Sequence, residues 1–171
     1  LVKSLETDEA YGVGNNGEIF DVTFGLYAET DLTAADGTVI PADGLIEIIS
    51  LDENGKGTVN SDLPFGSYYV KELSTNSAYL LNEQKYPVHF EYAGQDTAVV
   101  HLSANDSEAI ENEIIYGSVS GLKSDEDGNA LGGAVIGIFK TGTEEFTKEN
   151  AIQTTTSADD GSFSLEKVPY G

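Results

Sequence analysis

Short stretches of alternating apolar and polar residues occur along most of the chain, separated by segments rich in Gly, Asp and Asn. A period of two residues is typical of half-buried β-strands, and Asp-Gly or Asn-Gly pairs are typical of the turns that join them. The apolar residues 129–139 could form a helix by composition, but three glycines and several β-branched residues favour a strand. The pattern predicts an all-β protein, with a turn at 52–55, a hairpin of 86–92 with 97–102, and further strands at 1–6, 19–27, 45–51, 56–59, 67–73 and 110–115.

The stretch at residues 62–73, DLPFGSYYVKEL, is the most informative of these. Pro and Gly predict a tight turn at residues 63–66, and the Tyr-Tyr-Val that follows is typical of a strand. Alternation assigns the strand residues to two faces, Tyr68, Val70 and Glu72 to one, and Tyr69, Lys71 and Leu73 to the other. A carboxylate that shares a face with Tyr and Val is unusual, and a functional hypothesis has to explain it.

Four segments from the first part of the chain recur in the same order in its last third. The segments around Lys3 and Lys123 match, and the other matched pairs are 22–27 with 134–139, 55–59 with 161–165, and 63–66 with 168–171. A repeated order of motifs predicts two modules of one kind. We therefore expect tandem immunoglobulin-like β-sandwiches, the first complete at residues 1–115 and the second an N-terminal half at residues 116–171.

Charge and composition narrow the range of functions. There are 30 acidic residues against 8 Lys and no Arg, so the net charge is −22 and the basic surface that nucleic acids require is missing. An acidic surface also disfavours anionic membranes, and no run of about 18 apolar residues is present to span a bilayer. The absence of Cys excludes disulfides, thiolate metal sites and Cys nucleophiles. These features are typical of a secreted protein that owes its solubility to its charge.

The ordered motifs DENGKGTV, LPFGSYYVKE, YLLN and IENE, followed by GSVSGLKSDEDGNALGGA, resemble tandem collagen-adhesin B-type (Cna B) domains, also described as SpaA-like prealbumin-fold pilin domains. That family belongs to adhesins and pili of Gram-positive bacteria. The resemblance therefore implies prealbumin-like sandwiches in an extracellular, cell-wall-anchored surface protein whose anchor lies outside these residues. It also implies an intramolecular isopeptide bond between a Lys of the first strand and an Asn of the last, promoted by a Glu; the residues in those places are Lys3, Asn112 and Glu72.

Strand parity supports this assignment, because each of the three polar residues falls on an apolar face of its strand. Burial disfavours the charged form of a Lys or Glu, so Lys3 could attack as a neutral amine while Glu72 moves protons and ammonia leaves. Each molecule would react once on itself, which is maturation and not enzymatic turnover. Two alternatives stay open: a plain buried ion pair of Lys3 with Glu72 in which Asn112 is only a hydrogen-bond partner, or Asn105 as the acceptor. Lys123 matches Lys3, but residues 116–171 offer it no Glu or Asn in the matching places, so we expect it to be unlinked.

Weaker signals do not change this interpretation. His89 and His101 would lie opposite each other near Glu91 if the predicted hairpin forms, but two exposed His on a hairpin more often have no ligand. The acidic runs at residues 125–129 and 159–161 resemble calcium loops but lack a closing Glu at the right spacing, so we expect turns. We expect neither a metal nor another cofactor.

The sequence thus predicts a structural stalk or pilin module that holds an adhesive tip away from the cell wall, with other domains of the same surface protein as its partners. Two other functions stay open. Loops 7–18 and 74–84, with Tyr11 and Tyr79 as exposed aromatics, could bind a host extracellular matrix protein or a glycan. The chain could also be an accessory domain of a secreted carbohydrate-active enzyme.

Overall fold

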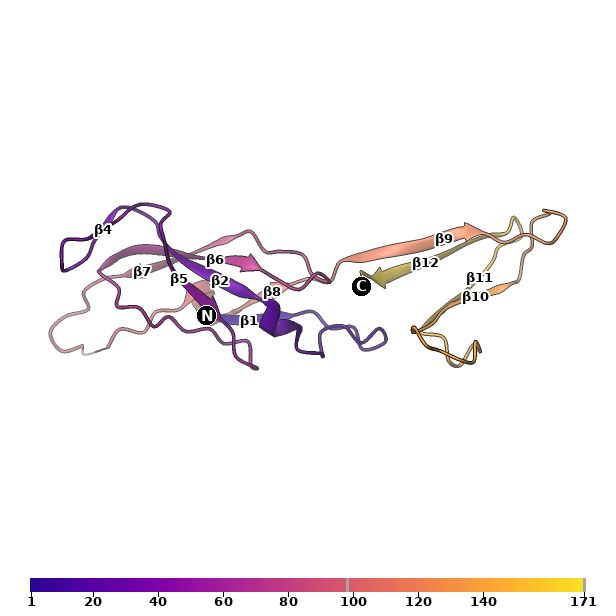
Figure 1. The fold of residues 1–171 in the computed structure, drawn as a ribbon, viewed down its shortest axis with the longest axis horizontal. Coiled ribbons are helices and arrows are strands. Elements are labelled where there is room, and N and C mark those ends of the chain that lie inside the picture. The colour runs from indigo at the N-terminus through magenta and orange to yellow at the C-terminus, as the bar shows by residue number, and fades with distance from the viewer. Residues whose placement is uncertain (98, 171) are drawn as a thin grey trace. The chain divides into compact units, whose positions relative to one another are not determined.

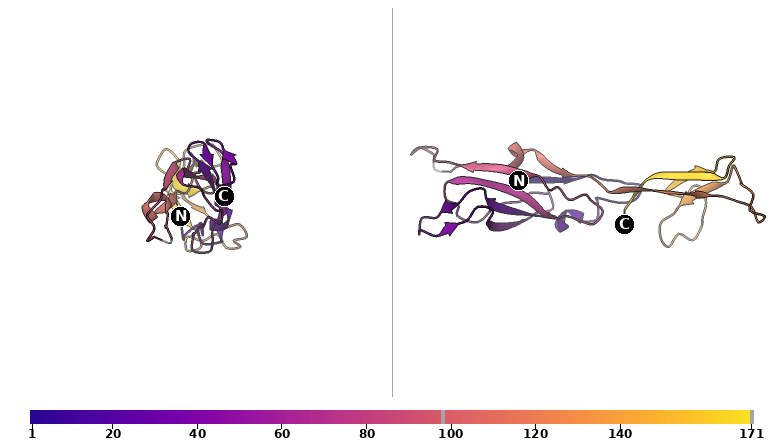
Figure 2. Two further views of the ribbon diagram at one scale, coloured as in Figure 1. Left: turned by 90° about the vertical axis from the view of Figure 1, so that its left-hand side faces the viewer. Right: turned by 90° about the horizontal axis from the view of Figure 1, so that it is seen from above.

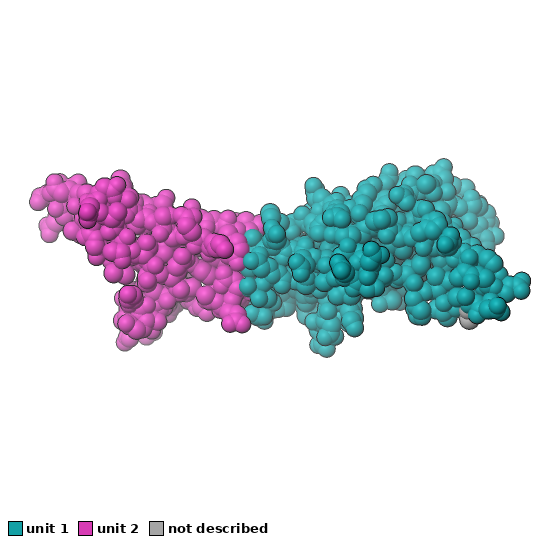
Figure 3. Space-filling model, turned by 180° about the vertical axis from the view of Figure 1, so that it is seen from behind, with its two compact units in different colours: residues 1–7, 14–114 teal, residues 8–13, 115–171 magenta. Residues whose placement is uncertain are grey.

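The computed structural model describes residues 1–97 and 99–170. Contacts within the chain divide it into two compact units, coloured teal and magenta in Figure 3. Unit 1 comprises residues 1–7 and 14–114, and unit 2 comprises residues 8–13 and 115–171. No helix among the described residues is long and apolar enough to cross a membrane.

The regular elements of unit 1 are mainly β-strands (Figure 1, Figure 2). Its antiparallel four-stranded sheet has the order β5 (Leu45–Ser50), β2 (Thr23–Ala28), β6 (Gly66–Ser74) and β7 (Lys85–Phe90). A second sheet pairs β1 (Val2–Leu5) in parallel with β8 (Ala109–Asn112). The remaining elements are the strand pair β3 (Leu32–Thr33) and β4 (Val39–Ile40) and two short 3-10 helices, η1 (Glu18–Asp21) and η2 (Ala104–Ser107).

The core of unit 1 joins the large sheet to β8. Phe24, Ile49 and Tyr68 from the large sheet and Ile110 from β8 are at most 2% exposed and belong to one apolar cluster. Burying a side chain of this kind stabilises the fold by roughly 1.5–3 kcal/mol. The predicted inner face of residues 67–73 is confirmed, because Tyr68, Val70 and Glu72 are all buried.

The opposite face of β6 is not simply exposed to solvent. Tyr69, which lies on that face, is only 6% exposed. Its ring stacks on Tyr27 with centroids 5.0 Å apart, and the Lys85 ammonium lies 4.0 Å from its centroid. Its hydroxyl donates to Asp43 at 2.8 Å. Tyr69 is therefore buried on the outer face by Tyr27 and Lys85. Alternation predicts the face on which a strand residue lies, but not the side chains of other strands that cover it.

Three predicted strand features of unit 1 are wrong. The strand expected at 19–27 begins only at Thr23, because η1 occupies residues 18–21. Residues 56–59 take part in only isolated bridges among the described residues. The expected hairpin of 86–92 with 97–102 does not form: β7 pairs with β6, and no described residue of 97–102 is in a strand, Ala98 lying outside the described residues.

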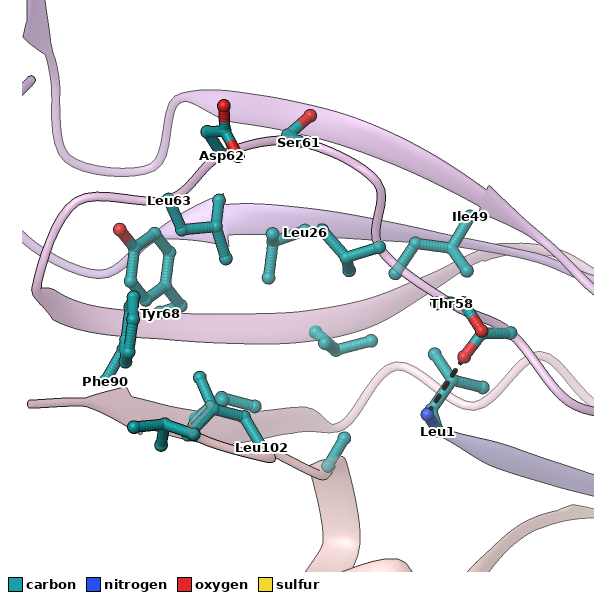
Figure 4. Close-up of a pocket in the computed structure, with 16 residues that line it drawn as sticks. Leu1, Leu26, Ile49, Thr58, Ser61, Asp62, Leu63, Tyr68, Phe90 and Leu102 are labelled. Atoms are coloured by element: carbon teal, nitrogen blue, oxygen red, sulfur yellow. Dashed lines mark hydrogen bonds between the residues drawn. The ribbon is translucent and has the colours of Figure 1, made fainter. Parts of the chain in front are cut away.

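Two apolar residues of that last segment line a cavity in unit 1. It has a volume of about 510 Å³ and is lined mainly by core side chains (Figure 4). Val100 and Leu102 contribute to its lining together with Phe90 of β7. Val100 is partly buried there, whereas Val99 and Leu102 are 64% and 37% exposed, so the alternation at 97–102 corresponds neither to a strand nor to a buried face.

Unit 2 contains two antiparallel strand pairs, β9 (Tyr116–Leu122) with β12 (Ser162–Pro169) and β10 (Val135–Ile138) with β11 (Gln153–Thr156). The strand β10 confirms that residues 129–139 are not helical. Leu165 is the one large apolar side chain that is buried among the described residues of this unit, and Leu122, Val135 and Phe146 are 78%, 58% and 73% exposed.

Both acidic runs of unit 2 are turns, as predicted. The Asp125 carboxylate accepts hydrogen bonds from the backbone N–H groups of Asp127 and Asn129, and that of Asp160 accepts from the backbone of Ser162. Short acidic side chains that bond to the backbone two residues on are the usual Asx-turns.

Candidate functional site: a buried lysine, glutamate and asparagine

Lys3 lies in β1 with its side chain inside unit 1, 3% exposed. In the parallel pairing of β1 with β8, Lys3 is opposite Ile110 and Leu5 is opposite Asn112. Lys3 and Asn112 therefore lie diagonally on neighbouring strands and on the same face, within reach of a long side chain. The Lys3 ammonium donates to the carbonyl groups of Ser4 and Ile110, each at 2.8 Å.

The backbone of Lys3 is also held from its other side. Its N–H donates to the carbonyl oxygen of Gly55 at 2.8 Å. Gly55 has φ +70, and a Cβ built on it would lie 2.2 Å from the Lys3 carbonyl oxygen. The Gly of the Asp-Glu-Asn-Gly turn is thus needed both for its left-handed backbone and for close approach to β1.

Glu72 lies on the inner face of β6 and is 1% exposed. The backbone of β6 pairs Glu72 with Phe24 of β2, so the carboxyl group is held on the best-buried part of the large sheet. It is one of the largest fully buried side chains in the chain, which is rare for an acid unless it has partners.

Asn112 is the last residue of β8 and is 2% exposed. Its amide nitrogen donates to Glu72 Oε1 at 2.6 Å and to Thr75 Oγ1 at 3.0 Å. The other two oxygens of this contact, Glu72 Oε2 and Asn112 Oδ1, are buried and have no hydrogen-bond partner among the described residues. Buried polar atoms without partners cost free energy, so this cluster is not optimised for stability alone.

Burial changes the pKa values of both ionisable groups in the cluster. Desolvation lowers the pKa of Lys3 to about 8, although the negative charges of Glu72 and Glu111 act to raise it. Desolvation also raises the pKa of Glu72, although the hydrogen bond from Asn112 and the charge of Lys3 act to lower it. Both shifts favour the neutral forms, since the apolar surroundings penalise charge.

The structure thus brings the three predicted residues to one side of one core and confirms that all three are buried. The alternative acceptor Asn105 lies in η2, with φ +54, and its amide is directed to the carbonyls of Glu108 and Ala109 at 3.3 and 3.4 Å. Lys71, assigned to the face opposite Glu72, is partly buried on that other face of β6.

Sequence reasoning missed Thr75, the second partner of the Asn112 amide. Thr75 follows the end of β6, so strand parity does not apply to it, and no other signal in the sequence marks it. Its contact depends on how the chain leaves the sheet.

The second lysine has a different environment. Lys123 is partly exposed, and its ammonium donates to the carbonyl of Ser124 at 2.7 Å, as Lys3 does to Ser4. Its backbone N–H donates to the carbonyl oxygen of Gly161 at 2.7 Å, repeating the contact of Lys3 with Gly55. The backbone contacts of the repeat are therefore reproduced, but among the described residues of unit 2 no buried Glu or Asn accompanies Lys123.

The other sequence candidates do not assemble into sites. His89 bonds to Ser67 Oγ at 3.0 Å and approaches Glu91 at 3.7 Å, and it is not opposite His101 because the expected hairpin is absent. Among the described residues no three His or acidic side chains gather as metal ligands. Tyr79, expected to be an exposed aromatic, is 3% exposed with its hydroxyl donating to Glu6 O, and Tyr11 is partly buried.

The family model of the SpaA prealbumin-like fold domain matches residues 11–106, which is more than half of the chain. The chain belongs to this SpaA prealbumin-like family. The membership confirms the resemblance and the all-β, prealbumin-like fold expected from the sequence motifs. Of the three clustered residues, the match covers Glu72 and leaves out Lys3 and Asn112.

Among solved structures, the Bacillus anthracis TIE protein is similar to this SpaA-family chain at 18% identity and a TM-score of 0.54, covering 88% of this chain and 23% of that protein. A C-terminal fragment of the pilus adhesin SpaC from Lactobacillus rhamnosus GG matches at 14% identity and a TM-score of 0.45, covering 98% and 70% of the two chains. A streptococcal ancillary pilin matches at 20% identity and a TM-score of 0.34, covering 88% and 46%. At such identities these likenesses concern the fold. No curated protein matches the sequence.

Proposed function

We propose that the chain is a structural stalk or pilin module of a Gram-positive surface adhesin, and that unit 1 is stabilised by a self-formed isopeptide bond between Lys3 and Asn112. The observation that carries the proposal is the contact of Glu72 with the Asn112 amide at 2.6 Å, with Lys3 buried on the neighbouring strand. Membership of the SpaA prealbumin-like family supports the surface-protein part of it.

The cluster has the chemistry that the bond requires. Neutral Lys3 attacks Cγ of Asn112, so that an Nζ–Cγ bond forms and the Cγ–Nδ2 bond breaks. Glu72, protonated at the start, gives its proton to Nδ2 and takes one from Nζ, and the nitrogen leaves as ammonia. No oxidant or cofactor takes part, and fixed proximity replaces a second substrate.

A plain buried ion pair explains the cluster less well. In such a pair the Lys3 ammonium would contact the Glu72 carboxylate, whereas it donates to the backbone carbonyl groups of Ser4 and Ile110. The Asn112 amide, and not the Lys3 ammonium, occupies Glu72 Oε1, and Asn112 Oδ1 is buried without a partner among the described residues, so Asn112 is not a fully satisfied hydrogen-bond partner of such a pair.

The bond also fits a load-bearing role. It would join the first strand of unit 1 to its last, because Lys3 lies in β1 and Asn112 in β8. Tension applied through the two ends of unit 1 would then pass through a covalent link, and the residues between 3 and 112 would not extend. This gives mechanical stability to a chain without Cys.

Intact mass measurement of the folded chain tests the proposal. Wild-type protein should lack one ammonia relative to its sequence mass, and a peptide joining Lys3 to Asn112 should be recovered after proteolysis. Glu72→Gln keeps the size of the side chain but removes the acid, and should show its full sequence mass. Glu113→Gln, at an exposed position next to the acceptor, is the matched control and should lose ammonia like wild type. Well-folded wild-type protein of unmodified mass would overturn the proposal.

A further inference from the structure

The Asn112 amide has two hydrogen-bond acceptors, and the first is the Oε1 atom of Glu72, the proposed proton shuttle. The second is the hydroxyl of Thr75, 3.0 Å from Nδ2. Thr75 lies just beyond the end of β6, three residues after Glu72, and is partly buried. The nitrogen that would leave as ammonia is therefore held at two points, by a carboxyl oxygen and by a hydroxyl oxygen.

We propose that Thr75 is a further functional residue of the cross-linking reaction, which holds the Asn112 carboxamide by its leaving nitrogen so that Cγ faces the Lys3 amine. This inference rests on the proposed isopeptide bond and adds a residue to it. Thr75 contacts a reacting atom, Nδ2, but neither gives nor takes a proton overall; the proton balance remains that of Lys3 and Glu72.

Two hydrogen bonds define the rotation of a carboxamide better than one. The terminal torsion of Asn is broad, so a single contact with Glu72 would leave the amide plane free to turn about Cβ–Cγ. The second contact restricts that rotation, since both N–H groups of Nδ2 then have fixed acceptors. Amide attack depends on the angle between the amine and the carboxamide plane, so orientation of this kind changes the rate.

The position of the hydroxyl also suits the end of the reaction. As Nδ2 is protonated and Cγ–Nδ2 breaks, the departing nitrogen keeps an acceptor in Thr75 while Glu72 Oε1 is occupied with proton transfer. The carbonyl oxygen Oδ1 has no partner among the described residues, so the leaving nitrogen is the only part of the carboxamide that this cluster binds. The role of Thr75 is thus specific to the leaving group.

The rate of cross-linking in the full chain tests this role. The chain is recovered in urea, its unmodified mass is verified, and folding is started by dilution; samples are quenched in acid and the loss of ammonia is followed by intact mass. Thr75→Val keeps the shape of the side chain and removes the hydroxyl, and should slow cross-linking by roughly tenfold or more once the chain is folded. Thr75→Ser restores a hydroxyl and should react at nearly the wild-type rate.

Thr23→Val is the matched control. Thr23 lies at the start of β2, and its hydroxyl forms a hydrogen bond with Ser74 Oγ at 2.7 Å. Ser74 directly precedes Thr75 in the sequence, but the Thr23 hydroxyl is not a partner of the Asn112 amide. It should cross-link as fast as wild type. Circular dichroism and denaturant unfolding of each variant separate slow folding from slow chemistry, and the rate is compared only after the folding phase is complete.

The outcomes distinguish this inference from the function on which it rests. If wild-type protein folds and never loses ammonia, the proposed bond is absent. If wild type cross-links and Thr75→Val does so at the same rate, the bond stands and the role of Thr75 is refuted. Equal slowing in Thr75→Val and Thr23→Val would also refute it, because the effect would then come from the fold of this strand end and not from the leaving group.

Discussion

The pH dependence of cross-linking should reveal the protonation state in which Lys3 and Glu72 react. The reaction needs neutral Lys3 and protonated Glu72, a combination that holds one proton between the two groups. In a coupled pair, the state with one proton is populated between the two apparent pKa values, and its reactive fraction is constant there. Desolvation lowers the pKa of Lys3 to about 8, so above that pH the pair loses its last proton. Below the raised pKa of Glu72 the pair takes up a second proton.

The rate should therefore be level around neutral pH and fall on both sides. At pH 9, one unit above the pKa of about 8, about a tenth of the molecules keep the proton, so the rate should be about tenfold below the plateau. A Lys with an ordinary pKa of about 10.4 would keep almost all of its rate at that pH. Lowering the pKa of Lys3 from about 10.4 to about 8 means that burial destabilises the charged amine by about 3 kcal/mol relative to the neutral one.

The assay is the same refolding and acid-quench mass measurement, carried out between about pH 5 and 10. Circular dichroism at each pH confirms that the chain is folded, so that a slower reaction reflects protonation and not unfolding. A folded protein that cross-links as fast at pH 9 as at pH 7.5 would refute the reasoning, since it would mean that burial does not shift the pKa of Lys3.

Three further predictions concern stability and the second unit. Lys3→Met keeps the buried alkyl chain but cannot form the proposed bond, which would close a loop from residue 3 to residue 112. By the chain-entropy estimate for disulfides, the unfolding free energy of this variant, measured in denaturant, should be about 4–5 kcal/mol lower than that of wild type. Gly55→Ala places a Cβ 2.2 Å from the Lys3 carbonyl oxygen, whereas Gly37→Ala, also at positive φ, meets nothing within 4 Å. Gly37→Ala should cost about 1–2 kcal/mol of backbone strain and Gly55→Ala clearly more, with slower cross-linking; equal losses in thermal unfolding would contradict the close approach. Lys123 should remain unmodified, so peptide mapping should find its free amine and the intact mass should lack one ammonia and not two.

Much of the site followed from local sequence rules. Glu72 stood out because alternation placed an acid on the face of Tyr68 and Val70, and the burial of all three agrees. Parity in the same way identified Lys3 and Asn112 as inward-facing. These predictions succeeded because a strand places alternate side chains on opposite faces whatever surrounds it.

Other predictions failed where the outcome depended on partners far away in the sequence. Residues 97–102 alternate like a strand, but Val100 and Leu102 line a cavity and β7 pairs with β6. Tyr69 is buried on the outer face because Tyr27 and Lys85 cover it, and Tyr79 is buried where a loop aromatic was expected at the surface. Periodicity describes one strand and carries no information on which strand or side chain lies beside it.

The sequence alone thus determined that Lys3, Glu72 and Asn112 face inward, the order of the repeated motifs, and the three residue types on which the proposed chemistry depends. Tertiary structure decided which of them meet. The parallel pairing of β1 with β8 joins residues more than 100 positions apart, and it sets Lys3 diagonally to Asn112. The turn of the chain after β6 brings Thr75 to the Asn112 amide. Both contacts arise because packing of the whole unit fixes strand register and strand ends, and no local pattern encodes either.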